Sequence, residues 1–296
     1  MAERSDGITE DVVAFGPGLV GVLTRPAGTG SPLSPLGFVL VGAGLLHSVG
    51  PNRLYVRISR RLAARGHVVL RYDAAGIGDS AAPSGGDETT HDPRRVTEAA
   101  FELVRAETGA SRFALIGICS GATLAFQTAV EQECAVGLAL ANVDVGGFDA
   151  ALDDELRWRM ARRYYGGMAW MRHASWRRFL TGRSNYAKIL GVIGHAWKGR
   201  RDKLSGQPWA GQLAEDLTRL NRRPVELLII ASEIDISADY VAVVRRTTPA
   251  AVLATERVTL HVVQGADHTF TLKAHQTELL RLLESWADRV DPSRSA

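Results

Sequence analysis

The glycine-flanked run at residues 117–121 (GICSG) places the tightest constraint on the fold. It follows an apolar run at 113–116 (FALI), which predicts a buried strand, and it precedes 122–130 (ATLAFQTAV), which suits a helix. A chain that passes so quickly from strand to helix needs a very tight turn, with small residues two places before and after its apex. Gly117 and Gly121 occupy those places, so we expect Cys119 at the apex of a strand–turn–helix unit.

The rest of the chain alternates strand-like and helix-like segments. A hairpin is predicted over 12–24, divided by GPG at 16–18, and an amphipathic helix with Leu279, Leu280, Leu282, Leu283 and Trp286 closes the chain. Continuous apolar strands are predicted at 38–41, 67–72, 113–118, 136–143, 225–231 and 258–263, and further helices at 53–65, 92–107 and 122–130. Apolar strands that alternate with helices indicate an α/β fold whose mostly parallel sheet is buried on both faces.

This alternation stops between residues 147 and 223, where five of the six tryptophans occur. We expect a helical cap or lid at 147–223, inserted between a core of 1–146 and its continuation at 224–296, because long insertions are usually functional. A peripheral helical layer is the alternative. The aromatic residues that we expect to line an apolar substrate pocket under the cap are Trp158, Tyr165, Trp170 and Trp176.

Composition excludes several classes of protein. The chain has 296 residues, is 46% hydrophobic and carries a net charge of +3, with no stretch near the roughly 20 apolar residues of a membrane helix. We therefore expect neither a membrane nor a nucleic-acid partner. The start of the chain lacks the apolar stretch of a secretory signal, and two cysteines do not form a disulfide framework, so we expect a cytoplasmic location.

The apex residue Cys119 is a candidate nucleophile, which requires a base and an orienting acid. Ser120 fails as an alternative apex because Ile118, two places before it, would not fit the turn. His268 follows the strand at 258–263 and is the expected base, and Asp235 follows the strand at 225–231 and is the expected acid. Two other acids, Asp239 and Asp144, remain open as alternatives to Asp235.

Backbone N–H groups are expected to stabilise the oxyanion of the reaction. One belongs to Ser120, after the apex, and the other to Ala43 or Gly44, in the loop after the strand at 38–41. Residues 73–80 (DAAGIGDS) are interpreted as a structural turn and not as a phosphate cradle. Because the chain has no HExxH, CxxC or His/Asp cluster, we expect no metal and no other cofactor.

These features resemble the α/β-hydrolase superfamily over nearly the whole chain. Residues 47–80, the GICSGA turn and residues 176–190 (WRRFLTGRSNYAKIL) are also similar to exosortase-associated hydrolases, which carry a Cys-Ser pair in the elbow and a closing DHTF-like motif. This resemblance implies Cys119 as nucleophile, Asp235 as acid and His268 as base. The loop at 42–45 (GAGL) departs from the glycine-glycine-proline start of that family. Dienelactone hydrolases and polyhydroxyalkanoate synthases share the Gly-x-Cys-x-Gly turn.

A cysteine nucleophile predicts acyl transfer through a thioester intermediate, which water or another nucleophile then resolves. We expect an ester or thioester substrate, either a small molecule or an acyl group on a carrier. Basic residues outnumber acidic ones in the expected cap, which would suit an acidic carrier protein, although a solvated basic face is the simpler interpretation. The alternatives are a C–C bond or lactone hydrolase of the same fold, and a non-catalytic protein that binds a small molecule under the cap.

Overall fold

The computed structural model describes residues 3–5, 7–28, 34–42, 46–82, 92–143 and 208–294. Several residues of the sequence analysis lie outside these ranges: Ala43, Gly44, Asp144, Trp158, Tyr165, Trp170 and Trp176. The predicted cap is therefore described only from residue 208 onward, and its boundaries stay a prediction.

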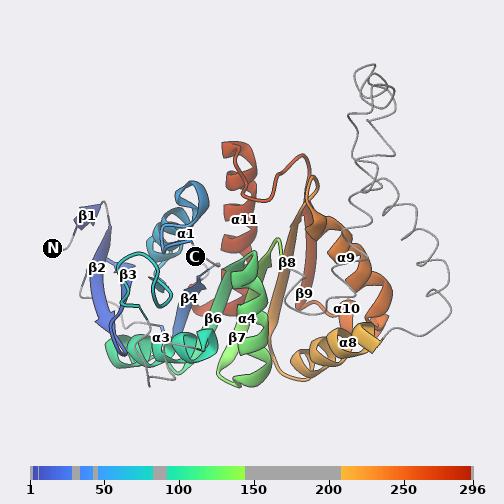
Figure 1. Cartoon of the computed structure of the whole chain (residues 1–296), viewed down its shortest axis with the longest axis horizontal. Coiled ribbons are helices and arrows are strands. Elements are labelled where there is room, and N and C mark those ends of the chain that lie inside the picture. The colour runs from blue at the N-terminus through green and yellow to red at the C-terminus, as the bar shows by residue number, and fades with distance from the viewer. Residues whose placement is uncertain are drawn as a thin grey trace, which may run out of the picture.

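A single sheet forms the centre of the molecule (Figure 1). Its strand order is β1-β2-β3-β5-β4-β6-β7-β8-β9. The strands are β1 (Glu3–Ser5), β2 (Ile8–Phe15), β3 (Leu19–Pro26), β4 (Leu36–Val41), β5 (Val68–Tyr72), β6 (Arg112–Ile118), β7 (Ala135–Ala141), β8 (Glu226–Ser232) and β9 (Val258–Val263). The pairs β1–β2, β2–β3 and β3–β5 are antiparallel, and every pair from β5 to β9 is parallel.

The strand order changes direction at β4, which lies between β5 and β6 and is parallel to both. In the β4–β6 register, Val41 pairs with Gly117, so the two strands end side by side. Open parallel sheets form their ligand crevice at such a switch point, beyond the carboxyl ends of the strands. This position is where the sequence places the turn of Cys119 and the loop after β4.

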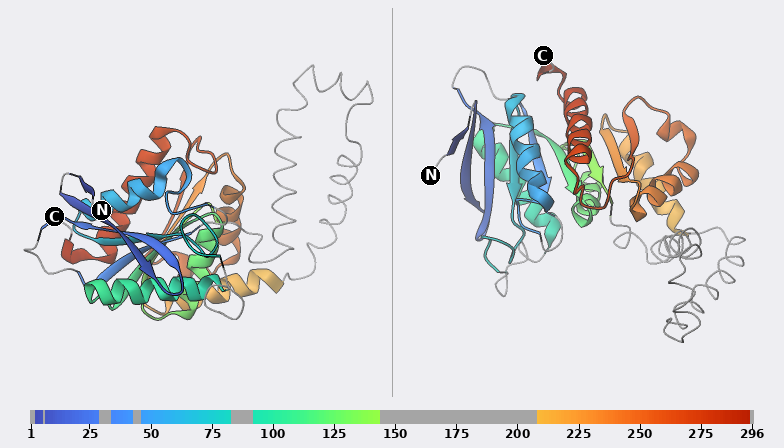
Figure 2. Two further views of the ribbon diagram at one scale, coloured as in Figure 1. Left: turned by 60° about the vertical axis from the view of Figure 1, so that its left-hand side comes forward. Right: turned by 90° about the horizontal axis from the view of Figure 1, so that it is seen from above.

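Helices cover both faces of the sheet (Figures 1 and 2). Apolar side chains of α3 (Pro93–Thr108), α4 (Ser120–Glu131), α8 (Pro208–Asn221), α9 (Ile236–Thr247) and α10 (Ala250–Leu253) belong to one core cluster. Those of α1 (Leu54–Ala64) and α11 (Lys273–Val290) belong to the other. Two short 3₁₀ helices, η1 (Pro51–Arg53) and η3 (Pro292–Arg294), precede α1 and follow α11. This arrangement confirms the predicted α/β fold with a sheet buried on both faces.

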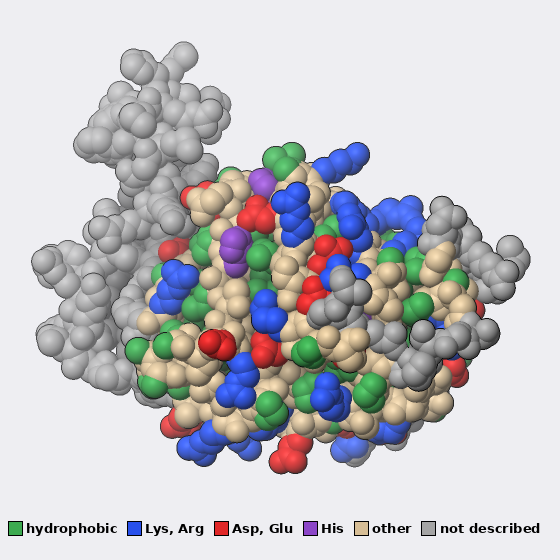
Figure 3. Space-filling model, turned by 180° about the vertical axis from the view of Figure 1, so that it is seen from behind, with side chains coloured by type: hydrophobic (Ala, Val, Ile, Leu, Met, Phe, Trp, Pro, Cys, Tyr) green, Lys and Arg blue, Asp and Glu red, His purple; other side chains and the backbone are tan. Residues whose placement is uncertain are grey.

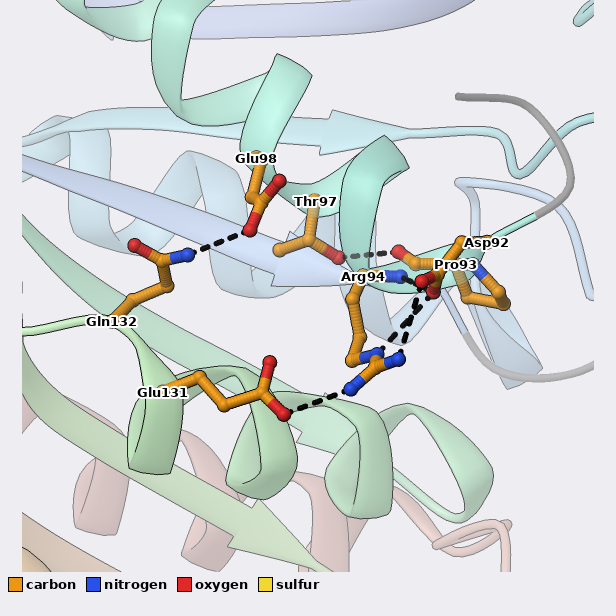
Figure 4. A network of polar contacts seen from close by, with 7 residues as sticks. All are labelled: Asp92, Pro93, Arg94, Thr97, Glu98, Glu131 and Gln132. Carbon is orange, nitrogen blue, oxygen red and sulfur yellow. Dashed lines mark hydrogen bonds and ion pairs between the residues drawn. The ribbon is translucent and has the colours of Figure 1, made fainter. Parts of the chain in front are cut away.

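Polar contacts tie the start of α3 to the end of α4 (Figure 4). Asp92 caps α3 by accepting a hydrogen bond from the Arg94 N–H at 2.9 Å, and the Arg94 guanidinium pairs with Glu131 at 2.8 Å. Gln132 donates to Glu98 at 2.6 Å. These contacts fix the helix that follows the Cys119 turn against its neighbour on the same face of the sheet.

The predicted strands and helices are confirmed with small differences in their ends. Helices α9 and α10 and strand β1 were not predicted. Helix α8 lies in the last part of the insertion that we expected to be helical, and its Leu217 and Leu220 are buried in the core. In the described part of the chain, no helix combines the length and the apolar character that a membrane crossing requires.

Candidate active site

Cys119 lies at the apex of the turn between β6 and α4, with a backbone φ of 56° and ψ of −129°. A residue with a side chain pays about 1–3 kcal/mol for such a conformation, which persists only where the surroundings enforce it. Here the Cys119 N–H still donates to the Ala141 carbonyl at 3.0 Å, so the strand continues to the apex residue. The half-buried thiol is thereby held out beyond the end of the sheet.

The two flanking glycines make this turn possible. A Cβ at Gly117 would lie 2.3 Å from the Gly121 carbonyl oxygen and 2.5 Å from the Ala122 nitrogen. A Cβ at Gly121 would lie 2.6 Å from the Val41 carbonyl oxygen. Because all these atoms belong to the backbone, no side-chain adjustment can relieve the overlap. The spacing of the two glycines thus has the steric cause that the sequence predicts.

His268 and Asp235 meet beside this turn. Asp235 follows β8 as the N-cap of α9, where its carboxylate accepts a hydrogen bond from the Ser237 N–H at 3.2 Å. His268, in the loop after β9, places its Nδ1 atom 3.1 Å from Asp235 Oδ2. The Cys119 side chain lies close enough to the same imidazole to raise its pKa. The structure therefore brings together the three side chains that the sequence analysis selected from three separate strands.

The electrostatics of this group favour a charged imidazole. The hydrogen bond with Asp235, followed by the interaction with Cys119, raises the pKa of His268 to about 10. Burial alone would raise the pKa of Asp235, but hydrogen bonds from His268 and Ser237 outweigh it and hold that pKa below its ordinary value. Asp235 is thus an anion that stabilises the charged form of the His268 imidazole, next to the Cys119 side chain.

We expect iodoacetamide to alkylate Cys119 much faster than Cys134 at pH 7. Burial raises the pKa of the Cys134 thiol and keeps it protonated, whereas the Cys119 thiol has the His268 imidazole beside it as a base. In His268→Gln the Cys119 rate should fall at least about tenfold, because this base is lost, while the Cys134 rate stays the same. Peptide mapping measures both rates in one sample. Equal rates for the two cysteines in the unmodified chain would contradict this electrostatic picture.

The alternative acids have different positions. Asp239 lies one turn further along α9, and Asp144 lies outside the described residues. Asp267, next to the imidazole in sequence, accepts a hydrogen bond from the Thr271 N–H at 2.8 Å and so shapes the loop. The carboxylate in contact with His268 is that of Asp235.

A tyrosine that was not among the predicted site residues stabilises the strand ends beside the turn. The Tyr55 hydroxyl, on α1, donates to the Val41 carbonyl at 2.8 Å and accepts from the Ile118 N–H at 3.3 Å. Burial raises the pKa of Tyr55, so the hydroxyl stays protonated. The phenol joins β4 and β6 where their ladder ends, one residue before Cys119. Helical spacing predicted α1 but could not indicate that one of its side chains reaches this point.

Replacing Tyr55 with phenylalanine should lower the free energy of unfolding by about 1–3 kcal/mol. The substitution leaves the buried Val41 carbonyl and Ile118 N–H without their partner, while the ring and its packing remain. Urea denaturation followed by circular dichroism measures this loss. An unchanged midpoint would show that the phenol is not needed at the strand ends.

The expected oxyanion donors are described only in part. Ser120 is the first residue of α4, so its backbone N–H belongs to a helix N-terminus, which favours negative charge. The close approach of Gly121 to the Val41 and Gly42 carbonyls places the loop after β4 against the same turn. Ala43 and Gly44 lie outside the described residues, and their role stays a prediction.

The turn after β5 has a structural role, as the sequence analysis interpreted it. The buried Asp73 carboxylate accepts hydrogen bonds from the N–H groups of Ser48 and Asp79, the latter at 3.1 Å. A Cβ at Gly78 would lie 2.3 Å from this carboxylate. The Asp73 side chain therefore fills the interior of this turn, and it also holds Ser48 in the segment leading to α1.

The surface carries charged side chains of both signs. Acidic and basic side chains are interspersed over the face opposite the view of Figure 1, as Figure 3 shows. Some of the charged side chains form ion pairs, such as Arg65–Asp288 at 2.5 Å. Within the described ranges, no three His, Cys, Asp or Glu side chains are grouped so that they could hold a metal ion.

Comparisons with known proteins agree with this fold. No curated protein sequence is significantly similar to the chain. Solved structures share the fold at low sequence identity. A hypothetical protein from Pseudomonas aeruginosa has a TM-score of 0.58 and 14% identity, covering 97% of this chain and 95% of its own. A proline iminopeptidase from Mycobacterium smegmatis has a TM-score of 0.53 and 18% identity, covering 95% and 100%.

A third structure, a cold-adapted esterase from an Arctic intertidal metagenomic library, has a TM-score of 0.51 and 15% identity, covering 96% of both chains. At these identities the structures show a common fold alone. The sequence profile of the alpha/beta hydrolase family, however, matches residues 30–281, which include every strand from β4 to β9. The chain therefore belongs to the alpha/beta hydrolase family.

Proposed function

We propose that this protein is an acyl-transfer enzyme in which Cys119 attacks the carbonyl carbon of an ester or thioester. The observation that carries the proposal is the contact of one imidazole, that of His268, with both Asp235 and the thiol at the strained apex. Nucleophile, base and orienting acid within hydrogen-bonding reach of one another are the requirement for covalent catalysis.

In the first half of the reaction, His268 takes the proton of the Cys119 thiol as the sulfur forms a bond to the carbonyl carbon, and the carbonyl electron pair moves to oxygen. The Ser120 N–H, at the start of α4, is placed to stabilise this oxyanion. When the tetrahedral intermediate collapses, the bond to the leaving alcohol or thiol breaks, and His268 supplies the proton that this group needs. Asp235 holds the imidazole in orientation and stabilises its charged form. The product of this half is a thioester on Cys119.

In the second half, His268 removes a proton from the acceptor as the acceptor attacks the thioester. The acceptor oxygen, nitrogen or sulfur forms the new acyl bond, and the Cys119 sulfur leaves. Compared with oxygen esters, thioesters react more readily with amines and thiols than with water. A cysteine at the apex therefore suits transfer to another nucleophile as well as hydrolysis.

The comparisons support the substrate class only in outline. A cold-adapted esterase shares the fold, which agrees with an ester as the acyl donor here. The proposal includes both kinds of acyl donor, a small molecule and an acyl group on a carrier. The proposal that Trp158, Tyr165, Trp170 and Trp176 form an acyl pocket rests on the sequence.

Intact-mass spectrometry tests the proposal directly. The purified protein is mixed with p-nitrophenyl butyrate, or with the butyryl thioester of N-acetylcysteamine, and quenched in acid. We expect a butyryl adduct in the unmodified chain and in the matched control Cys134→Ala, which removes the other half-buried cysteine and keeps Cys119. Cys119→Ala should form no adduct. A butyryl adduct of equal yield in Cys119→Ala would overturn the proposal, and so would turnover with no adduct at any quench time.

A further inference from the structure

Asn142 lies directly after β7 and was not among the candidate residues of the sequence analysis. Its side chain is completely buried, and its backbone has a φ of 47°, in the left-handed region. The Asn142 N–H donates to the Ile230 carbonyl at 2.9 Å, so the residue is tied to the neighbouring strand β8. A strained and fully buried amide at the carboxyl end of a strand needs a compensating set of partners.

Four hydrogen bonds use the whole hydrogen-bonding capacity of the amide. Its Oδ1 atom accepts from the Ser232 N–H at 2.7 Å and from the Ser237 hydroxyl at 2.8 Å. Its Nδ2 atom donates to the Ser232 hydroxyl at 2.8 Å and to the His268 carbonyl at 2.7 Å. One side chain thus contacts the segment that carries the acid and the loop that carries the base.

On the acid side, the partners of Asn142 stand at both ends of a short turn. Ser232 ends β8, Ser237 lies in the first turn of α9, and Asp235 lies between them. The Asp235 N–H donates to the Ser232 carbonyl at 3.1 Å, and the Asp235 carboxylate accepts from the Ser237 N–H. Because Asn142 Oδ1 bonds to both Ser232 and Ser237, it fixes the turn between them, from which the Asp235 carboxylate projects.

On the base side, three carbonyl groups of the histidine loop accept hydrogen bonds from buried or partly buried side chains. The Asp267 carbonyl accepts from Ser232 at 2.8 Å, the His268 carbonyl from Asn142, and the Phe270 carbonyl from Gln276 at 2.8 Å. Within this set, Asn142 holds the peptide group of the base itself. A shift of that carbonyl would move the imidazole relative to Asp235.

We propose that Asn142 is a positioning residue that sets the distance between Asp235 and His268 by bonding to the backbone on both sides. The expected effect of Asn142 on catalysis rests on the proposed function, whereas its effect on the positions of Asp235 and His268 does not. Only an amide meets the requirement, because the site presents two donors to Oδ1 and two acceptors to Nδ2. Aspartate would keep the two accepted bonds and lose the two donated ones, and glycine would lose all four while tolerating the left-handed backbone.

The test compares Asn142→Gly and Asn142→Asp with a control of similar chemistry, Ser34→Ala. Ser34 is also buried, and its hydroxyl donates to Asp291 at 2.6 Å, but it precedes β4 at the opposite end of the sheet. The main readout is the far-downfield proton signal of an imidazole N–H bonded to a carboxylate, identified by its absence in His268→Gln. Urea denaturation gives the stability of each variant, and p-nitrophenyl butyrate gives kcat/KM.

We expect the unmodified chain and Ser34→Ala to show the downfield signal and both Asn142 variants to lose it. In Asn142→Gly the pKa of His268, measured by titration of its ring signals, should fall from about 10 toward 6.5. The kcat/KM should fall by about 10²-fold in both variants, the effect of a small misplacement of a catalytic group. If one Asn142 variant fails to fold, the other gives the same readings.

Two outcomes separate this inference from the proposed function. If the Asn142 variants lose stability as Ser34→Ala does but keep the signal and the His268 titration, Asn142 is a structural residue only and the inference is wrong. If they lose the signal while the unmodified chain forms no acyl adduct, the positioning role stands and the proposed function fails.

Discussion

Replacing Cys119 with alanine should lower kcat/KM for ester or thioester substrates by about 10³- to 10⁶-fold, the loss found when a catalytic nucleophile is removed. The physical reason is that no other group in the described site can form the covalent intermediate. Ser120, the next residue, begins α4, and the strained apex conformation belongs to Cys119 alone. The measurement is steady-state hydrolysis of p-nitrophenyl butyrate and of a butyryl thioester.

Two control variants make this result specific. Ser120→Ala keeps the backbone N–H that is expected to stabilise the oxyanion, so its kcat/KM should stay within about tenfold of the unmodified chain. Cys134→Ala removes the other thiol, whose pKa is raised by burial, and should be unchanged. A loss of activity in Ser120→Ala that matches the loss in Cys119→Ala would contradict the assignment of the apex residue.

Replacing Gly117 with alanine should prevent the turn from forming and destabilise the protein by more than 3 kcal/mol. Overpacking in a core usually costs about 1–3 kcal/mol, because neighbouring side chains yield. Here the added methyl carbon would lie 2.3 Å and 2.5 Å from backbone atoms of Gly121 and Ala122, which belong to the start of α4 and cannot move alone. Relief of the overlap requires separation of β6 from α4, which breaks the packing around Cys119.

A glycine elsewhere in the chain provides the matched control for this substitution. Gly109, the C-cap of α3, has a φ of 73°, but a Cβ there would meet nothing within 4 Å. Gly109→Ala should therefore lower the free energy of unfolding only through the strain of the left-handed backbone, by about 1 kcal/mol or a little more. Urea denaturation of both variants gives the comparison. Equal losses in Gly117→Ala and Gly109→Ala would show that the contact with α4 is not the cause.

The sequence predicted the parts of this molecule that depend on short-range pattern. Apolar runs located the strands, because strands buried on both faces need apolar residues at almost every position. The spacing of Gly117 and Gly121 located the turn, because the steric limit acts within five residues. The positions of Asp235 and His268 after strands were sufficient to bring them together, since the carboxyl ends of parallel strands share one edge of the sheet.

Other features depend on contacts between distant segments and leave no local pattern. Tyr55 looks like any apolar position of α1, yet its hydroxyl bonds to residue 118, which is 63 places away in the chain. Asn142 lies near the end of a predicted strand, but its partners Ser232 and His268 become visible only when β7 lies next to β8. Only acids were expected to act near that strand end, so the amide of Asn142 was overlooked.

The central claim is that the sulfur of Cys119 carries the acyl group. The most direct measurement is tandem mass spectrometry of the acid-quenched acyl-enzyme after digestion at low pH, which resolves Cys119 from Ser120 within one peptide. The account predicts fragment ions that place the butyryl group on Cys119, and release of that group by neutral hydroxylamine. Fragment ions that place it on Ser120, or on a residue outside the turn, would contradict the account.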